Sequence, residues 1–212
     1  MKTRKVQMPL ALLVAMTAAG SARGQQGAPG ANAPFAALRV SQQAAAPADA
    51  HKMADMGPIM DPVSTAVKGQ LPRFSKNMVA AAEAMPAEKY SFKPSPEMNT
   101  FGHLVMHIVQ SNNLFCSKIS GAAAPDVKYS ESDPKDKLVA GLKASFEYCA
   151  TALANVDDSK LSEQMMLFGN RPASRAGALI FLFGSWTDHY ATEAIYLRLN
   201  GILPPTAQPE KK

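Results

Sequence analysis

The 212-residue sequence predicts an all-α fold in which residues 59–205 form an antiparallel four-helix bundle. Two observations predict this fold. Four segments carry apolar residues at steps of three and four, which places those residues on one face of a helix. Polar connectors separate the segments and lack the alternation of apolar and polar residues that marks a strand. A chain of this length has room for one such domain with extensions.

The first predicted helix covers about residues 62–85. Pro72 lies inside this segment and predicts either a kink or a later start, because proline cannot donate a helical hydrogen bond. The connector that follows, residues 85–96, contains three prolines and cannot continue the helix. The apolar face of the first helix consists of Val63, Val67, Leu71, Phe74, Met78 and Ala81.

The second predicted helix begins near Asn99 or Thr100, because either side chain can cap the free N–H groups of a first turn. It runs to about Ser120, and Gly121 suits the residue after a helix end. The positions that share one arc of this helix, at 100° per residue, are Phe101, Leu104, Val105, Ile108, Phe115 and Cys116.

The third predicted helix begins at Asp133 and Pro134, a capping residue followed by a proline in the first turn. It extends to about Val156. Its buried face is predicted to consist of Leu138, Leu142, Phe146, Cys149 and Leu153.

The fourth predicted helix opens at Pro172 or Ser174 and ends at Asn200, before Gly201. A polar connector, residues 157–171, precedes it. An apolar patch in this connector predicts a homodimer interface, because exposed apolar patches on a domain often mark such contacts. The patch includes Met165, Met166 and Phe168.

Residues 1–24 have the pattern of a secretory signal peptide. Three basic residues precede an apolar stretch, residues 8–19, that is too short to span a bilayer. Small residues follow this stretch, so that cleavage is expected after Ala22 or after Gly24. The protein is therefore expected to be periplasmic or secreted.

The remaining extensions are a leader, residues 25–58, and a short C-terminal tail, residues 206–212. The leader is rich in Ala, Gly and Pro and is expected to be flexible, because it offers little apolar surface to bury. Removal of residues 1–24 would take away four of the 22 basic residues and none of the 17 acidic residues, so that the formal net charge falls from +5 to +1. We expect no nucleic-acid partner, because the mature chain has no dense basic cluster. No membrane association is expected after cleavage, because no second apolar run reaches membrane-spanning length.

The two cysteines, Cys116 and Cys149, are predicted to form a disulfide, because an exported chain with an even cysteine count meets oxidising conditions. Each lies near the end of its helix. Two antiparallel neighbouring helices would not automatically bring them together. A parallel pairing across a long crossover, or a suitable loop geometry, would have to bring the Cα atoms within about 7 Å.

Chemistry in the folded domain is expected at three histidines. His103 and His107 lie four residues apart on the second helix, so that both rings project from one face and could share a metal ion. Such a pair is more often a surface or boundary feature of a bundle. On the last helix, a polar stripe beside the apolar row suits a pocket between helices. The stripe consists of Ser185, His189, Thr192 and Tyr196.

Two stretches resemble the DinB/YfiT-like superfamily, particularly its exported members. Residues 90–108 read YSFKPSPEMNTFGHLVMHI, and residues 189–205 read HYATEAIYLRLNGILPP. The resemblance covers the whole predicted domain and implies a four-helix bundle. It also implies a divalent metal, zinc or nickel, held in many members by one histidine of the second helix and two of the last. Some members are thiol-dependent transferases or hydrolase-like enzymes, and many have no known activity.

Carried over by motif, two of these ligands correspond to His107 and His189. The third usually lies four residues before the last-helix histidine, where this chain has Ser185. A hydroxyl is a poor ligand for zinc compared with imidazole or carboxylate, so that the usual site is incomplete. Its replacements are His103, Asp188 or Glu193, of which only His103 and Glu193 are expected on converging faces.

The leading functional prediction is therefore a weak or degenerate divalent-metal site between the second and fourth helices. If such a site left a coordination position open, it would suit a metal-dependent hydrolase or a thiol-transferase-like enzyme, because a bound metal makes a coordinated water more acidic. The alternative is a metal-free structural or small-molecule-binding module, in which both histidines satisfy polar partners at the helix seam. The sequence names neither a substrate nor a catalytic residue.

Overall fold

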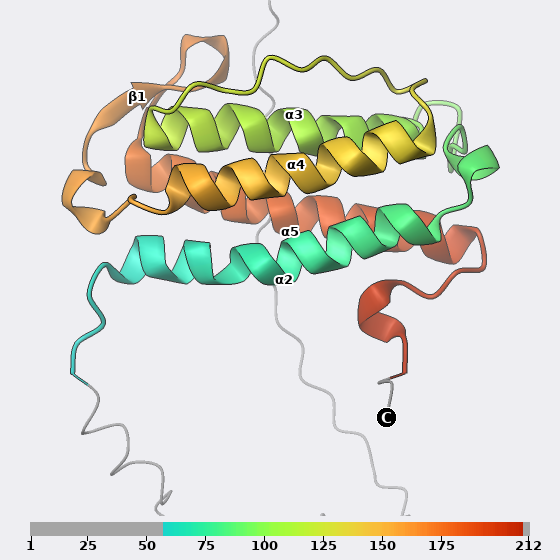
Figure 1. The fold of residues 1–212 in the computed structure, drawn as a ribbon, viewed down its shortest axis with the longest axis horizontal. Coiled ribbons are helices and arrows are strands. Elements are labelled where there is room, and N and C mark those ends of the chain that lie inside the picture. The colour runs from blue at the N-terminus through green and yellow to red at the C-terminus, as the bar shows by residue number, and fades with distance from the viewer. Residues whose placement is uncertain (1–56, 210–212) are drawn as a thin grey trace, which may run out of the picture. The chain divides into compact units, whose positions relative to one another are not determined.

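Four long helices pack side by side in the computed structural model, which describes residues 57–209 (Figure 1). The predicted four-helix bundle is confirmed. The predicted signal peptide and nearly all of the predicted leader lie outside the described residues, as do residues 210–212. The helices are α2 (Pro62–Ala84), α3 (Phe101–Ser120), α4 (Lys135–Leu153) and α5 (Arg175–Leu199). Within the described part of the chain, no helix is long and apolar enough to cross a membrane.

Except for Val63, which is only partly buried, the predicted apolar faces form the core between the helices. All the positions predicted to be buried on the third helix are buried, and Trp186 of α5 is fully enclosed. The largest side chains in this core include Trp186, Phe101, Phe146, Met78 and Met85. These side chains come from all four helices, so that the core holds the bundle together by burying their apolar surfaces.

Capping side chains define where α3 and α5 begin. The Thr100 hydroxyl accepts a hydrogen bond from the His103 N–H at 2.9 Å, and the Ser174 hydroxyl accepts one from the Gly177 N–H at 3.1 Å. Each satisfies an N–H group that the first turn leaves free. The predicted cap at Asp133 is wrong, because its carboxylate instead accepts a hydrogen bond from the Ser130 N–H in the preceding loop.

Helix α2 runs through Pro72 without interruption and bends near its middle (Figure 1). Of the two predicted effects of Pro72, a kink or a later start of the helix, the structure has the kink. The start of α2 is capped from far along the chain. The Asp158 carboxylate accepts hydrogen bonds from the N–H groups of Val63 and Ser64, at 2.9 and 2.8 Å. A residue about 95 positions away therefore satisfies N–H groups that no local side chain reaches.

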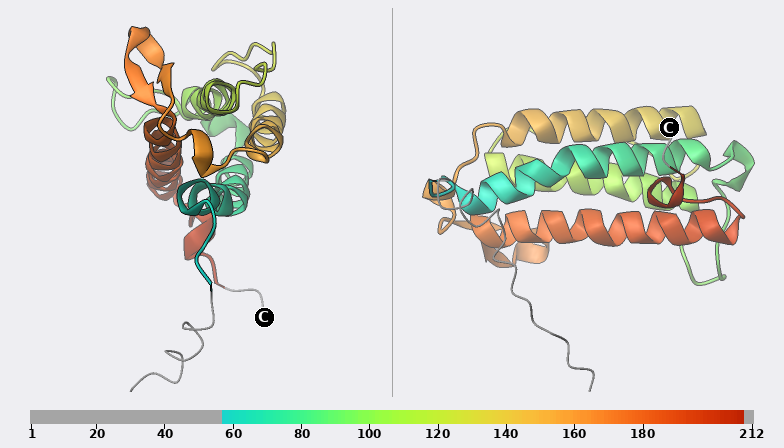
Figure 2. Two further views of the ribbon diagram at one scale, coloured as in Figure 1. Left: turned by 90° about the vertical axis from the view of Figure 1, so that its left-hand side faces the viewer. Right: turned by 90° about the horizontal axis from the view of Figure 1, so that it is seen from below.

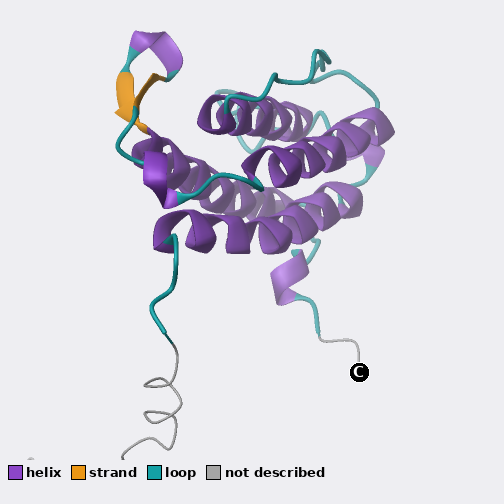
Figure 3. Ribbon diagram, turned by 60° about the vertical axis from the view of Figure 1, so that its left-hand side comes forward, coloured by secondary structure: helices purple, strands orange, loops and turns teal. Residues whose placement is uncertain are grey.

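Helices α3 and α4 run parallel, whereas α2 and α3, like α4 and α5, run antiparallel (Figure 1). Residues 121–134 form the crossover that makes this pairing, and they pass back along α3 (Figure 3). At about 3.3 Å per residue, this segment can span a helix of about 30 Å. The parallel pairing brings Cys116 and Cys149 together, and their disulfide is confirmed, with Cα atoms 5.2 Å apart.

A short antiparallel hairpin, absent from the predicted elements, precedes α5. Its strands are β1 (Gln164–Met166) and β2 (Pro172–Ser174), with Met165 opposite Ala173. The hairpin projects at the end of the bundle where α5 begins (Figure 2). Arg175 anchors it, because its guanidinium donates to the Ile119 carbonyl at the end of α3 and pairs with Glu163 at 2.8 Å. The sequence did not predict these strands, because three residues are too few to show an alternation of apolar and polar side chains.

The crossover approaches α3 closely at Gly102, and this contact yields a testable prediction. A Cβ atom at Gly102 would lie 2.6 Å from the Glu131 carbonyl oxygen. Gly102→Ala is therefore expected to lower the free energy of unfolding by about 1 to 3 kcal/mol, although alanine normally stabilises a helix. Denaturant unfolding measures this change.

The matched control for Gly102→Ala is Gly69→Ala in α2. An added Cβ at Gly69 meets no atom within 4 Å. Gly69→Ala is expected to raise the free energy of unfolding by about 0.5 to 1 kcal/mol, because only the helix propensity changes. If Gly102→Ala were as stable as Gly69→Ala, the close approach of the crossover would not constrain α3.

Candidate functional site

The two histidines expected to share a cavity lie side by side between α3 and α5. The ring centroids of His107 and His189 are 5.0 Å apart, and the rings meet edge to face, at 86°. His189 is buried, with 8 % of its surface exposed. Because α3 and α5 are antiparallel neighbours, two residues 82 positions apart in sequence become direct neighbours.

A serine one helical turn away lies beside each ring. The Ser185 hydroxyl is 3.2 Å from Nδ1 of His189, and the Ser111 hydroxyl is 3.5 Å from Nε2 of His107. The second nitrogen of each ring has no hydrogen-bond partner among residues 57–209. Ser111 was not among the predicted site residues. Its spacing of four from His107 was the available signal, since such positions adjoin on a helix.

Both imidazoles are neutral at pH 7. Burial is the main reason that the pKa of His189 is lowered to about 4; nearby His107 adds to the effect and Asp188 opposes it. Burial also lowers the pKa of His107, together with the neighbouring His103. A neutral imidazole keeps a nitrogen lone pair, which is the form that binds a metal ion or accepts a hydrogen bond.

The two rings open into a cavity of about 380 Å³. One end is polar and the other is aromatic. At the aromatic end, Phe168 of the hairpin lies 5.3 Å from Phe115 and 5.4 Å from Phe181, measured between ring centroids. Phe168 belongs to the predicted apolar patch, and here it lines the cavity. The lining residues are His107, Ser111, Phe115, Phe168, Phe181, Gly184, Ser185, Asp188 and His189.

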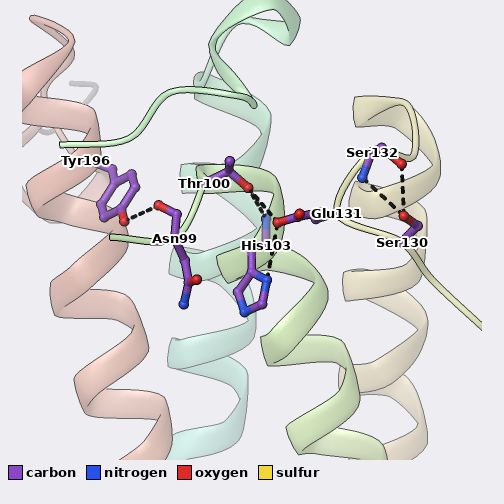
Figure 4. A network of polar contacts seen from close by, with 7 residues as sticks. All are labelled: Asn99, Thr100, His103, Ser130, Glu131, Ser132 and Tyr196. Carbon is purple, nitrogen blue, oxygen red and sulfur yellow. Dashed lines mark hydrogen bonds and ion pairs between the residues drawn. The ribbon is translucent and has the colours of Figure 1, made fainter. Parts of the chain in front are cut away.

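His103 lies outside this cavity, although it was predicted to share the metal. Its ring stacks on that of His107 with a centroid distance of 6.3 Å, and its Nδ1 lies 3.3 Å from the Glu131 carboxylate. Thr100 donates to the same carboxylate at 3.1 Å. Figure 4 shows this network at the start of α3, where Glu131 of the crossover lies against His103. Glu131 was not among the predicted site residues.

Glu193, which was predicted to lie in the pocket, is not among the residues that line the cavity. Its side chain is completely buried. Both carboxylate oxygens lack a hydrogen-bond partner within the described part of the chain. Each four-residue step along a helix rotates a side chain by about 40°, and from His189 this step turns Glu193 into the core. Burial raises the pKa of the Glu193 carboxyl well above its usual value.

Asp188 lines the same cavity as the two histidines, contrary to the expectation that only His103 and Glu193 lie on converging faces. The cavity face of α5 passes through positions 181, 185, 188 and 192, so that Asp188 lies at its centre and His189 at its edge. A carboxylate is also a better ligand for a divalent metal than the Ser185 hydroxyl.

The donor set at this point is a pair of imidazoles. Between residues 57 and 209, no three His, Cys, Asp or Glu side chains are grouped closely enough to hold a metal ion. The pair itself fits one. With bonds of about 2.0 Å to a tetrahedral zinc ion, two imidazole centroids would lie about 5 Å apart. The observed separation is 5.0 Å.

Comparison with known proteins places the chain in a family. The family model described as the DinB superfamily matches residues 70–192, which include α3, the hairpin and both cavity histidines. The chain belongs to the DinB superfamily. No curated protein is detectably similar to it in sequence.

Solved structures share the fold of this DinB-superfamily chain. A DinB-like protein from Bacillus subtilis is 21% identical, with a TM-score of 0.56, over 69% of this chain and 99% of that chain. One from Bacillus cereus is 17% identical, with a TM-score of 0.56, over 66% and 93%. A mutant of the mycothiol-dependent maleylpyruvate isomerase is 10% identical, with a TM-score of 0.50, over 60% and 59%. At such identities the likeness concerns the fold.

Proposed function

We propose that this DinB-superfamily chain binds a divalent metal ion, zinc or nickel, weakly through His107 and His189. The convergence of these two neutral imidazoles on one cavity, 5.0 Å apart, carries the proposal. Asp188 is the nearest carboxylate donor on the cavity wall. Two strong protein ligands and one weaker candidate favour micromolar rather than nanomolar affinity, because structural zinc sites use four.

The side chains around the pair would orient it. If the Nδ1–H of His189 donates to Ser185, its Nε2 carries the free lone pair. If the Nε2–H of His107 likewise donates to the Ser111 hydroxyl, its Nδ1 carries the free lone pair. A bound divalent metal with open coordination positions would supply an acidified water or a polarised thiol, as in hydrolases and thiol transferases. The aromatic end of the cavity would hold the organic part of a substrate.

Calorimetric titration of the mature chain with zinc and with nickel tests this proposal. Wild type is expected to bind one ion with a dissociation constant of about 1 to 100 μM. His107→Ala and His189→Ala are each expected to weaken binding at least about tenfold, because each removes one of two imidazoles. Since the pKa of His189 is about 4, binding should not have to displace a proton from this ring between pH 6 and 8.

His103→Ala is the matched control, because His103 lies on the same helix but outside the cavity. It should change the affinity less than about twofold. Loss of binding in His103→Ala alone would place the metal elsewhere. Nanomolar affinity in wild type would show a complete site, and no binding heat at all would favour the metal-free alternative.

We also propose that the chain is exported. The pattern of residues 1–24 supports export, and so does a disulfide, since disulfides persist in oxidising compartments. Mass spectrometry of protein from the periplasm or medium should find an N-terminus after Ala22 or Gly24. An intact Met1 would contradict it.

A homodimer remains the proposed assembly. Met166 and Phe168 are 47 % and 45 % exposed on the hairpin, which supports this proposal. Met165 packs partly buried against the core. Light scattering tests the assembly, and a monomer at micromolar concentration would contradict it.

A further inference from the structure

A second cavity, of about 300 Å³, adjoins the histidine pair on the side away from the hairpin. His107 lines both cavities, so that they meet at this residue. The polar residues that line the second cavity are Glu97, Asn99, His103, Thr192 and Tyr196. Tyr196 donates to the Asn99 carbonyl at 2.7 Å and thereby closes this end between α5 and the start of α3 (Figure 4).

The two cavities follow one seam between α3 and α5. On α5, their lining runs from Phe181 at one end to Tyr196 at the other, and on α3 from Phe115 to His103. At a rise of 1.5 Å per residue, this seam extends for about 20 Å. A ligand that occupied both cavities would therefore be elongated. We call the two adjoining cavities together the α3–α5 groove.

The two ends of the α3–α5 groove differ in chemistry. The hairpin end is aromatic, and its Phe168 and Phe181 rings are 45 % and 49 % exposed. Exposed aromatic rings facing a cavity favour an apolar ligand group, because covering them removes apolar surface from water. The opposite end carries Glu97, whose pKa is lowered by hydrogen bonds from its own backbone and from the Ser95 hydroxyl, so that it is ionised.

The charge along the groove has one sign. Apart from the histidines and Tyr196, the ionisable side chains that line it are Asp188 near the middle and Glu97 at the polar end, with Glu131 behind His103. Among residues 57–209, no lysine or arginine lines either cavity. Both histidines at the junction are buried in part and neutral. The carboxylates Asp188 and Glu97 would repel an anionic ligand, whereas they would attract a cation.

We infer that the α3–α5 groove binds an elongated cationic amphiphile, with its aromatic or alkyl end against Phe168 and Phe181 and its amine at Glu97. The backbone of the ligand passes His107 between the two ends. This binding goes beyond the proposed metal site and does not depend on a bound metal. The hairpin has a role in it, because Phe168 supplies one wall of the apolar end.

Two fluorescent probes that differ only in charge test this inference. Monodansylcadaverine carries an aromatic dansyl group and a primary amine at opposite ends of a flexible linker. Dansyl-6-aminohexanoate has the same aromatic group and linker but ends in a carboxylate. Both are titrated into the mature chain in the presence of EDTA, and the blue shift of dansyl emission reports burial. The amine probe is expected to bind at least about threefold more tightly than the carboxylate probe.

Variants at the two ends separate the contributions. Phe181→Ser is expected to weaken both probes about tenfold, because it removes apolar contact area. Glu97→Gln is expected to reduce the preference for the amine by about threefold and to leave the carboxylate probe nearly unchanged. Phe168→Ser, on the hairpin, should weaken both probes as Phe181→Ser does. Ile195→Ser is the control, because Ile195 is an exposed apolar residue of the same helix that lines neither cavity.

The inference is overturned if the two probes bind equally, if the carboxylate probe binds more tightly, or if neither binds. It is also overturned if Phe181→Ser and Ile195→Ser have equal effects. EDTA removes divalent metals, so that the probe titration does not depend on metal binding. The probe titration and the metal titration can therefore fail independently of each other. Circular dichroism of each variant confirms that the helices are retained.

Discussion

Replacing Asn112 with leucine is expected to lower the free energy of unfolding by about 2 to 4 kcal/mol. This buried side chain links three helices. Its amide donates to the Ser145 hydroxyl of α4 at 3.0 Å, and its carbonyl oxygen accepts from the Trp186 indole N–H of α5 at 2.8 Å. Leucine would leave the indole N–H buried without a partner. Denaturant unfolding monitored by circular dichroism measures the change.

Asn113 supplies a matched control on the same turn of α3. Its side-chain oxygen is buried and has no partner within the described residues, so that Asn113→Ala should cost less than about 1 kcal/mol. The double variant Asn112→Leu with Trp186→Phe should lose less than the sum of the single variants, by about 1 to 2 kcal/mol, because both partners are then apolar. Strict additivity would show that the indole bond contributes little.

Glu193→Met is expected to stabilise the protein, and to do so more at high pH. The Glu193 carboxyl is fully buried without a hydrogen-bond partner among the described residues. Burial raises its pKa well above the ordinary value of 4.5, so that the folded state holds a proton that the unfolded state releases. The free energy of unfolding is therefore unaffected by this proton below pH 4.5, and it falls as the pH rises from 4.5 toward the folded-state pKa. Each pH unit in this window costs about 1.4 kcal/mol.

The measurement is the difference in unfolding free energy between Glu193→Met and wild type at pH 5 and at pH 7. This difference should grow between pH 5 and pH 7, because the buried carboxyl of wild type loses stability as the pH rises. The comparison cancels the opposite contribution of His189, whose lowered pKa makes stability fall as the pH drops below 6.5. Glu147→Met, at an exposed position of α4, is the control and should leave the difference constant. Parallel curves for Glu193→Met and wild type would contradict a buried, protonated carboxyl.

Glu193 also shows how far helical spacing predicts a site. Its position four residues after His189 suggests a shared face, and the polar end of the groove does continue along α5 at Thr192 and Tyr196. Each four-residue step nevertheless rotates the side chain by about 40°, and His189 already lies at the edge of the cavity face. Asp188 directly precedes His189, about 100° away around the helix, and this places it on the cavity wall. The sequence contains the residues of this site. Helical spacing alone, however, does not resolve whether Thr192 or the adjacent Glu193 faces the groove.

The sequence by itself determined the helices, the apolar core, and the pair His107 and His189, and it limited two caps to Asn99 or Thr100 and to Pro172 or Ser174. Helical periodicity and capping depend on residues within a few positions of one another, and the pair followed from motifs of the family. Only the tertiary structure decided the parallel course of α3 and α4, the capping of α2 by Asp158, and the aromatic wall that Phe168 adds to the cavity. These features depend on contacts between segments far apart in the chain, and packing chooses among the alternatives that local sequence allows.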